Sequence, residues 1–296
     1  MKHAFFLLFF VFGTAMAGFC QVKGIIVDKE TNKPVAFANI WVENENLGAT
    51  SSEKGEFSLG QSDMQGKTLV ISCLGYEKAR VTIPGEVLRV ALTPSAIALK
   101  EVTVKKSTKR NKLIVNRLDD NTEYSFGSNG TPWIVAQYIP YKPTYAATPF
   151  LDEVSLVSLS NLKNATFKLR LLQVGENGAP GSDLLSVPLL GVAPKGIKTV
   201  KLDLSQHDLK IPEQGFFIAF EWLILKQNRY EAIDPETGAK EVPARITYEP
   251  SIRCYGPDQR TPNGWIYHQG KWTSTSQREG DAITSATPHF QLTLSN

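Results

Sequence analysis

The chain has 296 residues, a formal net charge of +3 and 42% hydrophobic residues. This length suits about two domains of roughly 100–200 residues each, and the composition is that of a globular protein. The small, dispersed positive charge gives no reason to expect a nucleic-acid partner.

Residues 1–20 are predicted to be a secretory signal peptide. A basic start at Lys2 and His3 precedes an unbroken apolar run, residues 4–12, which is too short to span a bilayer. Small residues follow at 15–18, so we expect cleavage and export to the periplasm, the outer membrane or the cell surface. The alternative is a lipid anchor at Cys20, which is disfavoured because the bulky Phe19 precedes it. No later segment is long and apolar enough to predict a membrane-spanning helix.

Short strands separated by turns are predicted over residues 22–92. The strand 22–27 leads into a turn in which Asp28 is expected to cap local backbone groups. The next strand, 35–42, alternates, and its uniformly apolar face (residues 36, 38, 40 and 42) should point inward. Residues 53–55 predict a hairpin between 49–52 and 56–59, because Gly55 can adopt a positive φ. Further strands are expected at 69–73, 78–83 and 88–92.

These residues also carry a family resemblance. The matching positions are Gly24, Asp28, Thr31, Pro34, Ala38, Thr50, Gly55, Phe57, Leu59 and the triplet Leu74-Gly75-Tyr76. Together they resemble the carboxypeptidase-regulatory-like domain, a transthyretin-like β-sandwich that opens many exported proteins of Bacteroidetes. The resemblance implies a domain over residues 21–95 without catalytic machinery of its own.

A linker is predicted over residues 96–122. Residues 98–104 resemble the junction that follows this domain in TonB-dependent outer-membrane receptors, and the basic run 105–112 is typical of a solvated connector. The receptor's role is not expected here, because the remaining residues are too few for its large barrel.

Residues 123–296 are again rich in predicted strands. Candidates are 133–139, 151–159, 165–174, 199–204, 215–225 and 290–294. Alternation at 165–174 and 199–204 indicates strands with one buried face, while the continuous apolar run 215–225 marks the centre of the core. The layout resembles the jelly-roll-like sandwiches of exported carbohydrate-binding and adhesion proteins. The predicted fold class is therefore all-β, with a transthyretin-like β-sandwich followed by a larger jelly-roll-like β-sandwich.

Sequence motifs give no sign of catalysis, and the chain is predicted not to be an enzyme. The histidines are isolated, with no zinc spacing, and no nucleophile elbow or nucleotide-binding loop is present. Adjacent carboxylates such as Asp152 and Glu153 should point to opposite faces of a strand and not act as a pair. No metal or cofactor is expected. Cys73 and Cys254 are expected to be unpaired thiols, with a bridge between them as the alternative.

Aromatic residues near the end of the chain form the weak candidate ligand-binding site: Tyr255, Trp265, Tyr267 and Trp272. Aromatic rings beside polar side chains can stack on sugar faces. The competing interpretation is that Trp265 and Trp272 face each other across a hairpin at 269–270 and pack on the sandwich.

The predicted function is therefore that of an exported binding or adhesion protein, with a glycan or an envelope protein as partner. The alternatives are a structural accessory subunit of an outer-membrane complex, whose first domain docks by strand addition, and, less favoured, a hydrolase accessory protein.

Overall fold

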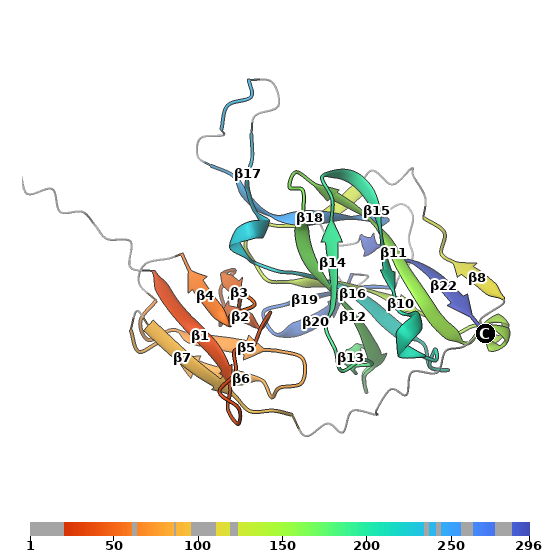
Figure 1. Cartoon of the computed structure of the whole chain (residues 1–296), viewed down its shortest axis with the longest axis horizontal. Coiled ribbons are helices and arrows are strands. Elements are labelled where there is room, and N and C mark those ends of the chain that lie inside the picture. The colour runs from red at the N-terminus through yellow and green to blue at the C-terminus, as the bar shows by residue number, and fades with distance from the viewer. Residues whose placement is uncertain are drawn as a thin grey trace, which may run out of the picture.

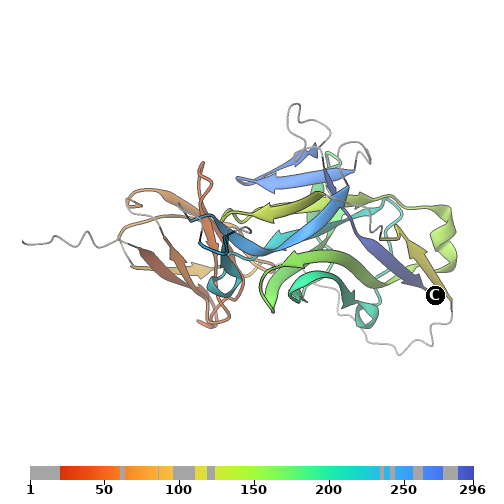
Figure 2. The same ribbon diagram turned by 90° about the horizontal axis from the view of Figure 1, so that it is seen from above.

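The computed structural model describes residues 21–60, 64–85, 87–95, 111–118, 124–233, 237–240, 244–255, 263–275 and 286–296. The predicted signal peptide, its cleavage sites and Cys20 lie outside these residues. Within them the fold is all-β, as predicted, with two β-sandwiches side by side along the long axis of the molecule (Figures 1 and 2).

The first sandwich packs two sheets on a single apolar core. One sheet has the order β4 (Glu56–Leu59), β1 (Val22–Asp28) and β7 (Val87–Leu92), with β1 and β7 parallel. The other has the order β3 (Gly48–Thr50), β2 (Asn39–Val42), β5 (Thr68–Ser72) and β6 (Ala79–Thr82). Buried side chains from both sheets, including Ile26, Ile40 and Leu88, form its core.

The second sandwich is larger, and its described strand pairs are all antiparallel. The sheet that faces the first sandwich, here called the front sheet, contains β10 (Ile134–Ile139), β12 (Ala165–Val174), β13 (Pro180–Asp183), β14 (Leu189–Ala193), β16 (Phe216–Trp222), β19 (Gly264–His268) and β20 (Lys271–Ser274). The back sheet contains β8 (Lys112–Val115), β9 (Tyr124–Ser128), β11 (Phe150–Ser160), β15 (Gly196–Asp203), β17 (Arg229–Glu231), β18 (Ile246–Tyr255), β21 (Thr287–Pro288) and β22 (Gln291–Ser295).

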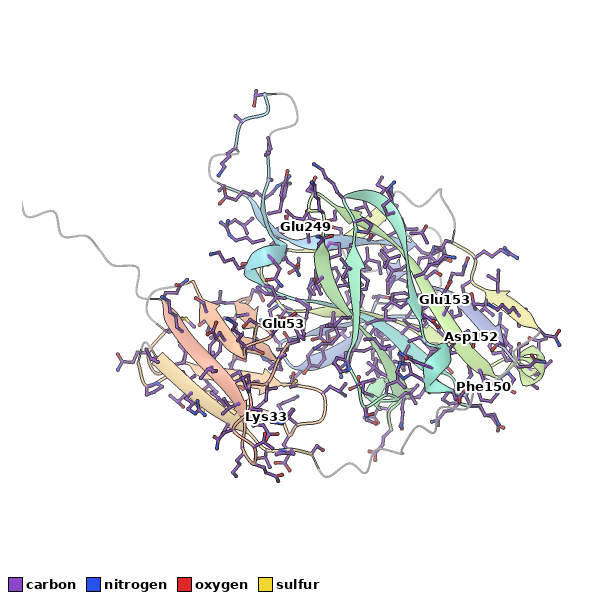
Figure 3. All side chains as sticks on the ribbon, in the orientation of Figure 1. Lys33, Glu53, Phe150, Asp152, Glu153 and Glu249 are labelled. Carbon is purple, nitrogen blue, oxygen red and sulfur yellow. The ribbon has the colours of Figure 1, made fainter. Side chains whose placement is uncertain are left out.

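Three short 3-10 helices, η1 (Pro143–Ala147), η2 (Ser205–His207) and η3 (Lys226–Asn228), complete the described elements of the second sandwich. Side chains fill the space between its two sheets (Figure 3), where Phe167, Phe220 and Trp222 of the front sheet meet Leu156 and Leu292 of the back sheet. This core is separate from that of the first sandwich.

Asp152 and Glu153, labelled in Figure 3, lie on β11 at the end of the second sandwich remote from the first. Asp152 is buried and accepts a hydrogen bond from Ser295 at 2.7 Å. Glu153 instead contacts Ser155 at 2.8 Å and Lys201 at 3.7 Å. The two neighbouring carboxylates therefore have different partners.

Three sequence predictions are corrected by these strands. Residues 112–115, placed in the predicted linker, form β8 and pair with β22, so the second sandwich begins before residue 123. The strand predicted over 35–42 begins only at Asn39, because Phe37 has a φ of +56° and breaks the extended backbone. Residues 53–55 do form a turn, with Gly55 at φ +73°, but the strands on either side pair with β2 and β1 and not with each other.

The cysteine prediction is confirmed: Cys73 and Cys254 are both free thiols.

The prediction that Asp28 caps local backbone groups is also confirmed. Its carboxylate accepts hydrogen bonds from the backbone N–H groups of Glu30 and Thr31 at 2.9 and 2.7 Å, and so caps the turn after β1. No described helix is long and apolar enough to cross a membrane.

Candidate functional site

The outer face of the front sheet brings together three of the four predicted site residues. Strand alternation places Trp265 and Tyr267 on the same face of β19, and Trp272 lies opposite Tyr267 on β20. All three are half-buried and pack on a small apolar cluster that includes Ile134 and Phe217. This cluster lies on the opposite side of the sheet from the main core.

Tyr255 does not belong to this group. It ends β18 in the back sheet, where its hydroxyl lies 2.5 Å from Nε2 of the buried His289. The centres of the two rings are 4.1 Å apart. Tyr255 is close to Trp265 in sequence but belongs to the other sheet, so the predicted four-residue group is divided.

The hairpin between β19 and β20 is confirmed, but its cross-strand pair differs from the prediction. Gln269 and Gly270 have φ values of +50° and +82°, which a two-residue hairpin turn of the primed type requires. With that turn, Trp272 lies opposite Tyr267 and Trp265 lies opposite Ser274. Trp265 and Trp272 therefore do not face each other, and Trp265 lies within a strand.

Tyr267 is part of the contact between the two sandwiches. Its ring meets Trp41 of β2 edge to face, with ring centres 6.1 Å apart, and meets Trp272 on the other side at 5.1 Å. Lys78 of the first sandwich lies 3.4 Å from its hydroxyl. Tyr267 thus packs between Trp41 of the first sandwich and Trp272 of the second, which gives its ring a structural role.

Trp265 has a different environment. Together with Tyr138, Asn263, Val174 and Gly178, it lines a shallow pocket of about 240 Å³ on the front sheet. Its ring is held edge to face against Phe217 at 6.1 Å. Tyr138 is also fixed, because its hydroxyl donates a hydrogen bond of 2.8 Å to the carbonyl of Gln214. Two oriented aromatic rings and one polar residue, Asn263, therefore line this pocket.

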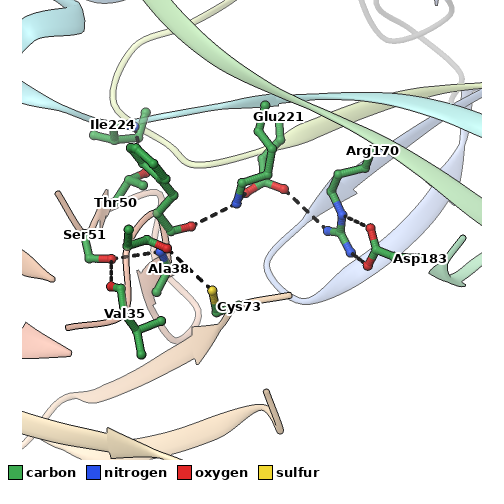
Figure 4. A network of polar contacts seen from close by, with 12 residues as sticks. Val35, Ala38, Thr50, Ser51, Cys73, Arg170, Asp183, Glu221 and Ile224 are labelled. Atoms are coloured by element: carbon green, nitrogen blue, oxygen red, sulfur yellow. Dashed lines mark hydrogen bonds and ion pairs between the residues drawn. The ribbon is translucent and has the colours of Figure 1, made fainter. Parts of the chain in front are cut away.

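A chain of ion pairs lies beside this face, where the two sandwiches meet (Figure 4). Lys168 on β12 bonds to Glu221 on β16 at 3.2 Å and donates to the carbonyl oxygen of Phe37 in the first sandwich at 2.9 Å. Arg170 lies 3.5 Å from the other oxygen of Glu221 and binds both oxygens of Asp183, at 2.9 and 2.6 Å. The side chains of Lys168 and Glu221 are only 6% and 3% exposed.

Backbone contacts and apolar packing complete this junction. The backbone N–H of Thr50, on the edge strand β3, donates a hydrogen bond of 3.2 Å to the carbonyl oxygen of Ile224, and the Thr50 hydroxyl accepts one of 2.8 Å from the backbone N–H of Ile224. Phe37 packs with Leu223 and Leu225 of that segment. The two sandwiches are therefore joined by buried polar and apolar contacts.

Sequence reasoning did not single out the ion-pair residues. One signal was available, since Glu221 is the single charge inside the apolar run 215–225, and an acid buried in such a strand requires a partner. Lys168 and Arg170 alternate with Phe167, Leu169 and Leu171, which indicates that they share one face of β12. Which strand supplies the acid could not be read from that pattern.

Among the described residues, no cluster of three or more His, Cys, Asp or Glu side chains is arranged to hold a metal ion. Two carboxylates of the front sheet, Asp183 and Glu221, are engaged by Arg170 and Lys168. The arrangement at this face is suited to contact with a ligand by aromatic rings and neutral polar groups.

Comparison with solved structures finds low-identity likenesses. A cysteine protease from Clostridium, Cwp84, is 11% identical with a TM-score of 0.40, over 88% of this chain and 65% of that one. A second structure, of the cysteine protease and lectin-like domains of Cwp84 from Clostridium difficile, is 9% identical with a TM-score of 0.39, over 91% of this chain and 61% of that one. This chain thus spans less than two thirds of either structure.

A Bacteroides uniformis protein provisionally described as carbohydrate binding is 11% identical with a TM-score of 0.22, over 78% of this chain and 96% of that one. No curated protein matches the chain in sequence. A family model does match part of it, over residues 22–104, which contain the first sandwich. The model is that of the CarboxypepD_reg-like domain, and a larger β-sandwich follows the matched part of the chain.

Proposed function

We propose that this chain is an exported, non-enzymatic binding protein of the bacterial envelope or cell surface, and that its second sandwich binds a glycan at the Trp265 pocket. The observation that carries the proposal is that two fixed aromatic rings, Trp265 and Tyr138, line one pocket together with the polar residue Asn263. Sugar rings offer an apolar face that stacks on such rings and hydroxyl groups that bond to an amide.

The size of the pocket supports one sugar ring as the unit bound. A volume of about 240 Å³ corresponds to roughly eight waters of liquid, which is less than the space that a long chain lying across the sheet would fill. No described residue of the first sandwich lines this pocket. Its part in the proposal is to hold β19 and β20 in place through the contact between Trp41 and Tyr267.

Export is supported by the pattern of residues 1–20, a basic start followed by an apolar run and small residues. We place the mature start between Gly18 and Gln21. Mass spectrometry of the protein recovered from its own host tests this part: an intact Met1 or an acylated Cys20 contradicts the proposal of soluble export.

The glycan is tested by a glycan array with the purified chain, followed by titration of any ligand found. Trp265→Ala should weaken binding at least ten-fold, because stacking is lost, while the fold is kept. Trp272→Ala is the matched control: it removes the same ring type from the neighbouring strand outside the pocket, so it should lower stability and leave the affinity for the glycan unchanged.

Two results would overturn the glycan proposal. One is the absence of any glycan ligand on the array. The other is unchanged affinity in both Trp265→Ala and Trp265→Leu, where the leucine variant keeps apolar volume and guards against simple unfolding of the alanine variant.

The accessory-subunit alternative retains one supporting observation. Strand β6 is an edge of its sheet, paired only with β5 among the described strands, whereas the opposite edge at β3 is used by the second sandwich. A partner strand could add at β6. Pull-down from envelope extracts that retains one partner, with no glycan found on the array, would favour this alternative.

A further inference from the structure

A second cavity lies between the two sandwiches and shares no lining residue with the Trp265 pocket. It is a cleft of about 320 Å³. One wall is the turn between β5 and β6 of the first sandwich, residues 72–76, and the other is formed by β12 and the segment 182–189 of the second. Domain boundaries are frequent places for small-molecule sites, and this volume lies at the lower end of their size range.

The apolar part of the cleft is aliphatic. Leu74 comes from the first sandwich, and Leu185, Val187, Pro188 and Leu189 come from the second. Val187 is 46% exposed, so its side chain is accessible from the cleft that it lines. The ring of Tyr76 also lines the cleft, but its hydroxyl is bonded to Asp28 at 3.0 Å. Aliphatic walls are better suited to a hydrocarbon chain than to a sugar, which aromatic faces recognise.

The polar part of the cleft is rich in hydrogen-bond donors. An ammonium group has three N–H donors and a guanidinium has five. Among the described residues, Lys168 directs its ammonium group to Phe37 and Glu221, and Arg170 directs three N–H groups to Asp183 and Glu221. Each cation therefore has donor capacity beyond these contacts, and both line the cleft.

The charges in the cleft leave one cation in excess. Glu221 and Asp183 balance Lys168 and Arg170, while Lys78, which is exposed, meets only the hydroxyl of Tyr267 and the ring of Trp41 among the contacts described. Burial raises the pKa of the Cys73 thiol, and burial with the bond to Asp28 raises the pKa of Tyr76 to about 12, so neither adds negative charge at neutral pH. A ligand with an anionic group would complement this lining.

We propose that the cleft binds an amphiphilic monocarboxylate, with its carboxylate at Lys78 and Arg170 and its aliphatic chain along Leu185 and Val187. The volume of about 320 Å³ corresponds to roughly ten waters of liquid, so a ligand of about ten non-hydrogen atoms fits. Octanoate has this size. The site is independent of the glycan pocket, and either can fail without the other.

Isothermal titration of the purified chain with butyrate, hexanoate and octanoate tests the aliphatic wall. Each buried methylene contributes about 0.8 kcal/mol, so each should tighten the dissociation constant about four-fold. The gain in affinity per methylene should stop near octanoate, because a longer aliphatic chain would extend beyond the cleft. Equal affinity for butyrate and octanoate, or no saturable binding of octanoate at millimolar concentration, would overturn the proposal.

Octanol tests the carboxylate, because it keeps the chain and removes the charge. It should bind at least about ten-fold more weakly, since a hydrogen bond to a charged group contributes more than a neutral one. Lys78→Gln should reduce octanoate affinity by a similar factor, whereas Lys195→Gln, at another exposed lysine away from the cleft, should not. Equal binding of octanol and octanoate would refute the assignment of an anionic ligand.

Val187→Ser tests whether the aliphatic chain of the ligand lies along Val187, and Val192→Ser is the matched control. Both valines are exposed, at 46% and 52%, but only Val187 lines the cleft. Val187→Ser should weaken octanoate several-fold, Val192→Ser should leave it unchanged, and neither should alter the melting temperature by more than a few degrees. Equal effects of the two substitutions on octanoate binding would contradict the placement of the chain.

Discussion

Replacing Lys168 with methionine should destabilise the whole chain, because it removes one partner of a buried ion pair at the junction of the sandwiches. The Lys168 ammonium lies 3.2 Å from Glu221, and both side chains are more than nine-tenths buried. Lys168 also satisfies the carbonyl oxygen of Phe37. After the substitution Glu221 keeps only Arg170, at 3.5 Å, and the carbonyl loses this donor.

The expected loss is about 3 kcal/mol. Breaking a buried pair by removing one partner costs roughly 3–5 kcal/mol, and the remaining contact of Glu221 with Arg170 favours the lower end. For a chain of this size, that loss corresponds to a fall in melting temperature of about 6–12 °C. Lys201→Met is the control: its ion pair with Glu153 spans 3.7 Å with the lysine side chain 64% exposed, so the loss should stay below about 1 kcal/mol.

Urea denaturation of a double-mutant cycle separates the ion pair from general disruption of packing. The double variant Lys168→Met, Glu221→Gln removes both charges of the pair. It leaves the ion pair between Arg170 and Asp183 in place, and the net charge of the junction is unchanged. The double variant should lose about 1–3 kcal/mol less than the sum of the two single variants. Strict additivity within about 0.5 kcal/mol would refute the reasoning, because it would mean that the two groups do not interact.

The remaining predictions concern the first sandwich. Gly75→Val should cost about 1–3 kcal/mol because Gly75 has a φ of +83°. Gly55→Val should cost more, since an added Cβ would also clash with the carbonyl oxygen of Ile26. Chemical denaturation of both variants measures the two losses of unfolding free energy, and equal losses would argue against the clash. Because the pKa of Tyr76 is raised from 10.0 to about 12 in the folded state, its contribution to stability is complete below pH 10 and is lost as pH rises to 12. The stability difference between the protein and Tyr76→Phe should therefore narrow over this range in pH-dependent melts, and a constant difference would contradict it.

Alternation of apolar and polar residues predicted strands that have one buried and one exposed face, such as β4 and β7, whereas other predicted strands, such as β2 and β16, are buried on both faces. Residues 165–174 were predicted as a strand with the bounds that β12 has. The continuous run 215–225 was also correctly placed at the core. It lacks alternation because the main core buries one face of β16, while the aromatic cluster and the first sandwich cover the other.

Pairing between distant segments was beyond local patterns. The chemistry of Gly55 predicted a turn correctly, but nothing in residues 49–59 indicates that β3 and β4 join different sheets. Phe37, which precedes β2, and Asn39 and Trp41 on β2 were not predicted to be inside, yet all three are buried, and second-sandwich residues pack on Phe37 and Trp41. Such burial depends on a domain contact that no periodicity encodes.

The register at the candidate site could have been predicted further than it was. Once Gln269 and Gly270 are taken as a two-residue turn, His268 must pair with Lys271 and Tyr267 with Trp272, and Trp265 then falls opposite Ser274. The separation of Tyr255 from the others could not be derived in this way. It follows from the chain crossing from the back sheet to the front sheet between β18 and β19.

Ligand binding at the two proposed sites should depend differently on the first sandwich. The cleft has walls from both sandwiches, whereas the described residues that line the Trp265 pocket all come from the second. Phe37→Ala removes a ring that packs on Leu223 and Leu225 and lines neither cavity. Loosening the junction in this way should therefore weaken octanoate binding several-fold and leave glycan affinity at Trp265 unchanged, as titration of the same variant with each ligand would measure. Equal loss of both ligands would mean that the variant has disturbed the second sandwich itself, and that the junction does not separate the two sites.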